Sequence, residues 1–313
     1  LQMKKLLGAG FGNIFNITKV FRNGEIGGPL HNPEFTMIEW YREKANYMDL
    51  MTDCEKLVLE LVQISRLESV YVHESQSNVQ IGQGPGYQLS PKKTLTYARP
   101  PNGLTDKPTT NKTIPYQSTL IDLTPPWPRL SINEAFQKYC QIDPLQNQTF
   151  ETLKKTANQL NYDTNGCNDW DDIFFKILLN HIEPNLGKSS RPVFLYDYPS
   201  TQAALAKKST KNPFFAERFE LYIAGIELAN AFSELIDPKE QRKRLKEEQE
   251  LRKSLKKTVF EVDEEFLASL ESIVHPCAGI ALGVDRLFML LLDQKSIEDV
   301  ILFPMSQMLK TNQ

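Results

Sequence analysis

The chain has 313 residues, 41% of them hydrophobic, which suits one large or two small globular domains. Its 36 Lys and Arg residues against 39 Asp and Glu residues exclude a general attraction to nucleic acid or to an anionic membrane. The cysteines are too scattered for a zinc site or a disulfide framework, which favours a reducing cytoplasm. Without a bilayer-spanning apolar run or a signal peptide, we expect a cytoplasmic protein with no membrane partner.

The first part of the chain is predicted to form a short helix, two strands and a long helix. Residues 3–7 suit the end of a helix, and residues 14–22 and 35–41 suit strands. Apolar side chains at helical spacing predict an amphipathic helix over residues 49–67.

Residues 73–128 differ in composition from the rest of the chain. They are rich in Gly, Pro, Thr, Asn and Gln and lack helical periodicity. We expect a flexible surface insertion here, within one domain that covers residues 1–313.

The remaining sequence alternates predicted helices and strands. Ser131 followed by Glu134 forms a capping box that predicts a helix start. The later predictions are helices over 150–160, 170–181, 238–257 and 264–272, a strand over 192–198, a hairpin over 218–231 that turns at Ala224 and Gly225, and a strand over 279–286 that enters a helix over 287–292. This order predicts an α+β fold, with an antiparallel sheet that carries a site on one face and helices on the other.

Charged groups interrupt the apolar stretch 21–41 in a way that packing alone does not explain. Strand alternation places Phe35, Glu39 and Tyr41 on one face, where the Glu39 carboxylate needs a cationic partner. No lysine or arginine shares that face of the strand, so the cation can be a ligand. Arg22 and His31 stand on either side of a glycine-rich loop and suit a polyphosphate; a hairpin with a salt-bridged Glu39 is the alternative.

A second cluster lies in the predicted hairpin. Glu220 and Glu227 flank its turn, and two facing carboxylates can hold a divalent cation. Strict alternation would put Asn230 and Glu234 on the face opposite Glu227, so we predict a β-bulge within residues 229–231. Exposed carboxylates on an edge strand are the alternative.

Arg286 is a third candidate, where a glycine-containing strand enters a helix. Gly279 and Gly283 leave room for a ligand, and we expect the neighbouring Asp285 to fix the guanidinium. This signal is weak without the other two stretches.

Together the three stretches resemble the lysine-type class II aminoacyl-tRNA synthetases. Residues 21–23 (FRN) with 31–41 (HNPEFTMIEWY) resemble their motif 2, and residues 279–287 (GIALGVDRL) resemble their motif 3. Residues 216–222 with 225–230 resemble their lysine-pocket segment. Within this family the chain looks most like the stand-alone lysyl-tRNA synthetase paralogues that ligate (R)-β-lysine to elongation factor P, on residues 39–42, 183–188, 199–206 and Ala229.

The resemblance implies a set of site residues, with ATP and Mg²⁺ as cofactors. Arg22 and Arg286 are implied as catalytic, and Glu220 and Glu227 as ligands of Mg²⁺. The implied ATP-binding residues are Arg22, Asn23, Glu25, His31, Phe35, Glu220, Glu227 and Arg286. The implied substrate-binding residues are Glu39, Tyr41, Ala229, Asn230 and Glu234. A glycine in place of Ala229 should enlarge the pocket and favour α-lysine.

The sequence departs from the family pattern in three places, one of which is Ala231, where the family usually has glycine. Gly24 stands where the family has glutamate, and Glu25 follows one position later in a loop with one extra residue. The sequence also begins after the family's motif 1, so we expect a catalytic domain without that motif and have no basis for the family's homodimer.

Three functions fit these observations. The first is activation of lysine or (R)-β-lysine with ATP and its transfer to elongation factor P, which makes tRNA an unlikely partner. The second is the catalytic core of a lysyl-tRNA synthetase, and the third is an ATP-binding paralogue with impaired catalysis. Ala229 and residues 199–206 favour the first.

Overall fold

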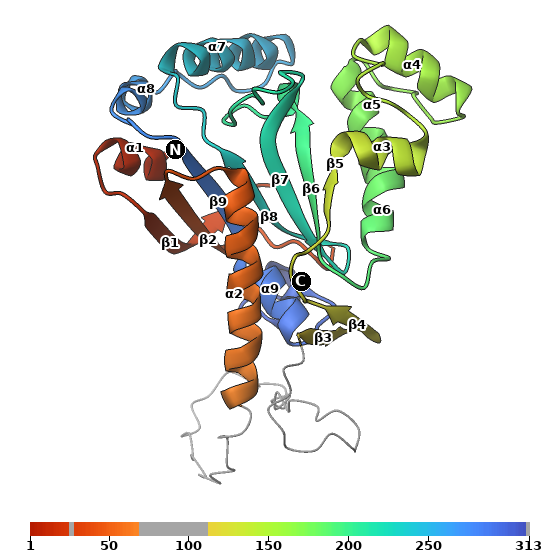
Figure 1. Ribbon diagram of the computed structural model, residues 1–313, viewed down its shortest axis with the longest axis vertical. Coiled ribbons are helices and arrows are strands. Elements are labelled where there is room, and N and C mark those ends of the chain that lie inside the picture. The colour runs from red at the N-terminus through yellow and green to blue at the C-terminus, as the bar shows by residue number, and fades with distance from the viewer. Residues whose placement is uncertain (25–27, 69–111, 311–313) are drawn as a thin grey trace.

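The computed structural model describes residues 1–24, 28–68 and 112–310, which fold around one seven-stranded sheet (Figure 1). The strand order is β1-β2-β9-β8-β7-β6-β5, and neighbours are antiparallel except the parallel pair β5 and β6. These strands are β1 (Ile14–Phe21), β2 (Glu34–Glu43), β5 (Arg129–Ser131), β6 (Val193–Pro199), β7 (Phe215–Ile223), β8 (Ile226–Ser233) and β9 (Cys277–Gly283). The predicted α+β fold with an antiparallel sheet is confirmed.

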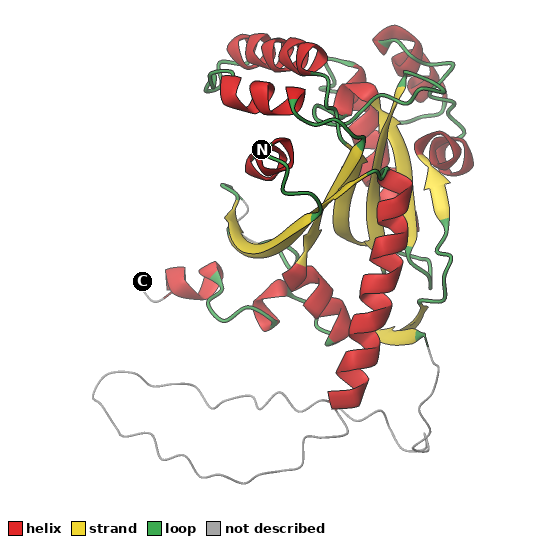
Figure 2. Cartoon of the chain, turned by 60° about the vertical axis from the view of Figure 1, so that its left-hand side comes forward, coloured by secondary structure: helices red, strands yellow, loops and turns green. Residues whose placement is uncertain are grey.

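Helices cover the sheet in groups, as Figures 1 and 2 show. The long helix α2 (Tyr47–Glu68) lies along one face of the sheet, and α9 (Val284–Leu291) lies near its lower end. A second group packs beside β6: α3 (Ile132–Cys140), α4 (Phe150–Gln159), α5 (Trp170–Ile177), a π-helix (Leu178–Ile182) and α6 (Glu183–Leu186). The third group is α1 (Gln2–Gly8), α7 (Pro238–Ser254) and α8 (Glu264–Glu271), and α10 (Met305–Lys310) is the last helix described.

Strand register gives the two faces of the sheet different chemistry. Ile38 on β2, Leu282 on β9 and Ala229 on β8 are aligned, and they join the apolar core that also holds Met51 and Val58 of α2. The next aligned row, on the opposite face, is Glu39, Ala281, Asn230 and Glu220. The alternation predicted for β2 therefore places Glu39 on the face away from α2.

The hairpin of β7 and β8 turns where the sequence predicts. Ala224 and Gly225 have φ values of 52° and 79°, as in the tight turns that suit the twist of a hairpin. A β-bulge follows, because Leu221 pairs with Ala229 while the next residue, Tyr222, pairs with Glu227. The extra residue is Leu228, one position before the predicted range 229–231.

Residues 112–128 are not the loop that the composition suggested. They hold the two-stranded hairpin β3 (Thr113–Tyr116) and β4 (Thr119–Asp122). Ile114, Ile121 and Trp127 are buried in the main core, and Glu55 accepts a hydrogen bond from the Trp127 backbone N–H at 2.7 Å. The remainder of the expected insertion, from residue 73 to 111, lies outside the described residues.

In the described part of the chain, no helix combines the length and apolar character needed to cross a bilayer.

The capping box predicted at Ser131 and Glu134 is present, and it begins α3 as expected. The helix predicted over 170–181 is interrupted, since its last turn widens into the π-helix.

Candidate active site

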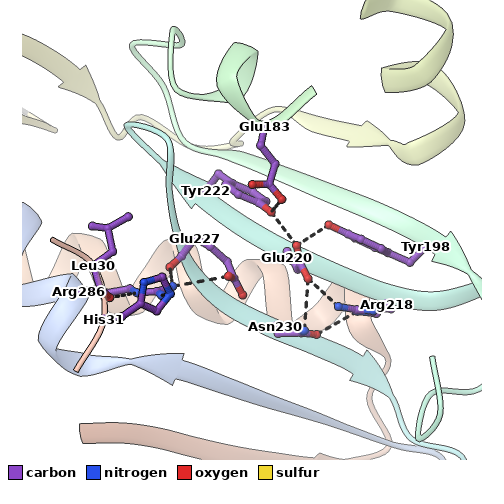
Figure 3. Close-up of polar contacts among 10 residues, drawn as sticks. All are labelled: Leu30, His31, Glu183, Tyr198, Arg218, Glu220, Tyr222, Glu227, Asn230 and Arg286. Carbon is purple, nitrogen blue, oxygen red and sulfur yellow. Dashed lines mark hydrogen bonds and ion pairs between the residues drawn. The ribbon is translucent and has the colours of Figure 1, made fainter. Parts of the chain in front are cut away.

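Arg286 is the centre of a cation-rich cluster at one end of the polar sheet face (Figure 3). Its guanidinium donates to the backbone oxygens of Leu30 at 3.2 Å and Glu227 at 2.8 Å. It also lies 3.0 Å from Nε2 of His31 and 3.6 Å from the Glu227 carboxylate. Arg286 therefore joins the β1–β2 connection to β8. It sits in the first turn of α9, directly after β9, where the sequence predicts that a strand enters a helix, although the helix begins at Val284 and not at the predicted Leu287.

Asp285 does not hold the Arg286 guanidinium as we expected. Its carboxylate is buried and accepts a hydrogen bond from the Thr36 backbone N–H at 2.6 Å. The contact ties α9 to β2 and so fixes where the helix, and Arg286 with it, begins.

Arg22 lies directly after β1 and faces Phe35 at the start of β2. Its guanidinium is 5.6 Å from the centroid of the Phe35 ring, and its backbone N–H donates to Pro33 at 2.9 Å. A guanidinium over an aromatic ring suits a nucleotide, with the ring available to a base and the cation to phosphate. Asn23 is exposed in the following turn, and Glu25 lies outside the described residues.

One cavity collects most of the predicted ATP-binding residues. Arg22, His31, Phe35, Glu227 and Arg286 line it, together with Asn230. Ala229 also borders it, although the register of Ala229 with Leu221 and Leu282 places its methyl group in the core. Asn23, Glu39, Tyr41, Glu220 and Glu234 do not line this cavity.

Glu220 lies at the centre of a second cluster on the same face (Figure 3). One of its oxygens accepts the Tyr198 hydroxyl at 2.5 Å and the Tyr222 hydroxyl at 2.7 Å. The other accepts the Arg218 guanidinium at 2.6 Å and, at 3.4 Å, the Asn230 amide. Burial raises the pKa of both tyrosines, so their hydroxyls stay protonated donors. Glu220 is therefore a fully bonded carboxylate.

Glu227 has a different environment. Its side chain is 42% exposed, and Arg286 is its cationic neighbour. Burial of its carboxyl group and the charge of Glu220 raise the pKa of Glu227 to about 7, against the effect of Arg286. Glu227 is opposite Tyr222 in the register, and Glu220 is opposite Asn230, so the two glutamates are diagonal neighbours and not a facing pair.

The two glutamates fit a divalent cation unequally. Carboxylate oxygens are the right ligands for Mg²⁺, and Glu227 offers them at the cavity wall. The four acceptor sites of Glu220 are taken, so it fits a metal only if one donor leaves, and the long Asn230 contact is the weakest. Among the described residues, no group of three or more His, Cys, Asp or Glu side chains lies close enough together to hold a metal ion.

Three of the predicted substrate-binding residues, Glu39, Tyr41 and Glu234, lie farther along the sheet. Tyr41 is aligned with Gly279, one row beyond Glu39. A Cβ atom on Gly279 would lie 2.3 Å from a Glu234 oxygen and 2.4 Å from the Tyr41 ring, so glycine is required for both to pack there. Burial, then the charges of Glu234 and Glu39, raise the pKa of Tyr41. Glu39, Tyr41 and Glu234 therefore gather at this end of the site.

The sequence interpretation missed two groups of partners. Arg218 and Tyr222 are each two positions from Glu220 on β7, so strand alternation could have placed them on the same face. Lys4, which pairs with Glu234, comes from a separate helix, and no local pattern connects the two.

The chain is similar in sequence to several known proteins. Residues 1–307 match the model of the class II tRNA synthetases (D, K and N). A lysine–tRNA ligase of Dehalococcoides mccartyi is 36% identical over 97% of this chain and 52% of its own length, so the chain spans about half of that relative. An elongation factor P (R)-β-lysine ligase of Haemophilus influenzae is 35% identical over 96% of this chain and 74% of its own length.

A further elongation factor P (R)-β-lysine ligase, from Hamiltonella defensa, is 32% identical over 98% of this chain and 75% of its own length. The relatives thus divide between two kinds of lysine ligase, and the match to the family model covers nearly the whole chain. The chain therefore belongs to the class II tRNA synthetase family (D, K and N), as a paralogue of the lysyl-tRNA synthetases.

Proposed function

We propose that the protein is an ATP-dependent ligase that activates (R)-β-lysine, or lysine, and transfers it to a lysine side chain of elongation factor P. The observation that carries the proposal is the charge arrangement on one sheet face. Arg22, His31 and Arg286 gather at one end, and Glu39 and Glu234 lie toward the other. Such a surface suits a substrate pair that is anionic at one end and cationic at the other.

The reaction has two steps. A substrate carboxylate oxygen attacks the α-phosphorus of ATP, the bond from that phosphorus to the bridging oxygen breaks, and pyrophosphate leaves. The acceptor amine then attacks the acyl carbon of the adenylate, an amide bond forms, AMP leaves, and the amine proton passes to solvent. Both steps depend on positioning and charge neutralisation more than on a protein nucleophile.

The residues of this chain divide those tasks. Arg22 binds the α-phosphate with its guanidinium and leaves the Phe35 ring to stack on the base. His31 and Arg286 neutralise the outer phosphates, and Arg286 is held in place by its two backbone contacts. Glu227, with Glu220 behind it, would hold Mg²⁺, which supplies further neutralisation of the triphosphate.

ATP/pyrophosphate exchange tests the activation step. We expect lysine-dependent exchange, with (R)-β-lysine preferred over α-lysine and with no exchange for norleucine, which lacks the terminal amine. Absence of exchange with both lysines would overturn the proposal and favour an ATP-binding paralogue with impaired catalysis.

The acceptor is a separate question with a second candidate. The lysine–tRNA ligase relative matches the chain with 36% identity, which keeps a catalytic core that charges tRNA as the alternative. The elongation factor P ligase relative supports the first acceptor, because the chain covers 74% of that protein. Radioactive lysine captured on elongation factor P, with none on tRNA, is the expected result, and the reverse would select the tRNA acceptor.

A further inference from the structure

Lys4 is a buried lysine whose ammonium group meets a carboxylate of the candidate site. It is 1% exposed, Glu234 is 2% exposed, and the two side chains form an ion pair. The ammonium also donates to the Leu205 backbone oxygen at 3.3 Å and lies 5.8 Å from the ring centroids of Phe232 and Phe266. A buried lysine needs such partners, because an unpaired buried charge is strongly unfavourable.

Helix α1 holds Lys4 in this position by close packing on α8. Leu7 is buried in a cluster with Phe266 and Leu270. A Cβ atom on Gly8 would lie 2.3 Å from the Ser269 backbone oxygen, so the two helices touch through the glycine. The ammonium of Lys4 is therefore fixed by the scaffold.

Glu234 is held from three sides. Lys4 pairs with one of its oxygens, and the other lies beside Gly279 and Tyr41. Its backbone N–H donates to the Cys277 oxygen at 2.8 Å, which fixes the chain where β8 ends. Lys4 and this backbone contact therefore fix the position of the Glu234 carboxylate.

A count of charges over the described residues shows what Lys4 contributes. Arg218 pairs with Glu220, and Arg286 neighbours Glu227. At the amine end, Lys4 pairs with Glu234, and none of the described lysines or arginines pairs with Glu39. These three charged side chains sum to −1, which suits one ammonium group.

We infer that Lys4 is a positioning residue of the amine-binding end. It anchors one oxygen of Glu234, so that the other oxygen, together with Glu39, meets a single substrate ammonium. The inference rests on the proposed function and goes beyond it, because it assigns a role in substrate recognition to a residue of α1 that does not touch the substrate.

The test is ATP/pyrophosphate exchange at pH 8, with lysine and ATP varied in turn, for wild type, Lys4→Met, Lys4→Arg and Lys5→Met. Lys5 is the matched control, since it lies on the same helix and pairs with Asp263 and Glu265 at the surface. For Lys4→Met we expect the KM for lysine to rise about tenfold or more, with kcat and the KM for ATP within about threefold of wild type. Lys4→Arg should recover most of the affinity for lysine, and Lys5→Met should behave as wild type.

Two results would overturn the inference. The first is a KM for lysine in Lys4→Met within about twofold of wild type. The second is a similar fall in kcat and a similar rise in both KM values in Lys4→Met and in Lys5→Met. If Lys4→Met does not fold, Lys4→Gln replaces it, because glutamine keeps a donor for Glu234 without the charge.

If wild type shows no exchange, the proposed function fails and thermal denaturation with added lysine decides the inference separately. A lysine-dependent rise in the melting temperature of wild type that Lys4→Met lacks would support it. An equal rise in both proteins, or none in wild type, would overturn it.

Discussion

The two ends of the polar sheet face differ in how far their charged side chains are exposed and paired. At the nucleotide end, Arg22 and His31 are exposed, and the strongest contacts of Arg286 are to backbone oxygens. At the amine end, Glu234 is buried and already paired with Lys4 from another helix. One end thus keeps exposed cations, whereas the other cancels part of its charge within the protein.

The difference follows from what each end would bind. A triphosphate carries several negative charges, so exposed cations at an open site attract it. A single ammonium carries one charge, and a buried pocket with two carboxylates would be too negative without an internal cation. Substitutions at either end, or between the two ends, therefore test this difference.

The largest effect is expected from Arg286→Ala at the nucleotide end. The substitution removes the guanidinium that we propose binds the phosphates, together with its links to Leu30 and Glu227. Pyrophosphate exchange should fall by about 10²–10³-fold, the usual cost of losing one transition-state donor. Arg242→Ala on α7, which breaks only a surface pair with Glu264, is the control and should stay close to wild type. Retention of more than a tenth of the activity in Arg286→Ala would contradict the role of Arg286.

The second effect concerns stability at the amine end. Burial, with some contribution from Glu39, raises the pKa of Glu234 from 4.5 to about 7 despite the stabilising charge of Lys4. Between these values the native state keeps a proton that the unfolded state has released, so the free energy of unfolding falls as pH rises through this window. The contribution is about 1–3 kcal/mol.

Urea unfolding at pH 5 and pH 8 measures this contribution. Wild type should lose stability between the two values, and Glu234→Gln should lose much less. The control is Glu151→Gln at the exposed start of α4, which should keep the wild-type slope. Identical slopes in wild type and Glu234→Gln would show that Glu234 does not titrate in this window.

Glu227→Gln tests the boundary between the two ends. Glutamine keeps the size of the side chain but removes the negative charge that suits Mg²⁺. The Mg²⁺ concentration for half-maximal exchange should rise about tenfold, with the KM for lysine nearly unchanged. Glu217→Gln on β7, which lies near Lys207, is the control. An unchanged requirement for Mg²⁺ would remove Glu227 from the metal site.

The smallest effect is expected from Ala229→Gly. The residue borders the cavity next to the bulged Leu228, so loss of its methyl group should give the strand room and raise the preference for α-lysine over (R)-β-lysine about threefold. The unfolding free energy should fall by about 0.5–1 kcal/mol. Ala231→Gly is the control, because Ala231 lies two residues farther along β8 on the same buried face. It should lower the unfolding free energy without changing the preference between the two lysines. Equal preferences in wild type and Ala229→Gly would contradict this role.

Local pattern was enough to predict much of this fold. Alternation along β2 correctly grouped Phe35, Glu39 and Tyr41 against Ile38, and the capping box marked the start of α3. The hairpin turn was found because few residues besides glycine accept its positive φ angles. These features depend on neighbours in the sequence, which is why the sequence alone reveals them.

The rest depends on contacts between distant segments. β9 pairs between β2 and β8, so Asp285 meets Thr36 and Gly279 meets Tyr41 only after the sheet has formed. The saturation of Glu220 by Tyr198 likewise needs the register of β6 and β7. The roles of the individual site residues, including Glu25, stay predictions.

The bulge at Leu228 makes this hairpin respond differently to the loss and to the gain of a residue. Glu227 and Asn230 share a face only because Leu228 is left without a partner in the register. Deletion of Leu228 would restore regular pairing with both side chains still on that face. Addition of one residue between them would also leave both side chains on that face in regular pairing, but it would move the partner of Asn230 two positions along β7, from Glu220 to Arg218. Related sequences should therefore shorten this part of β8 more readily than they lengthen it.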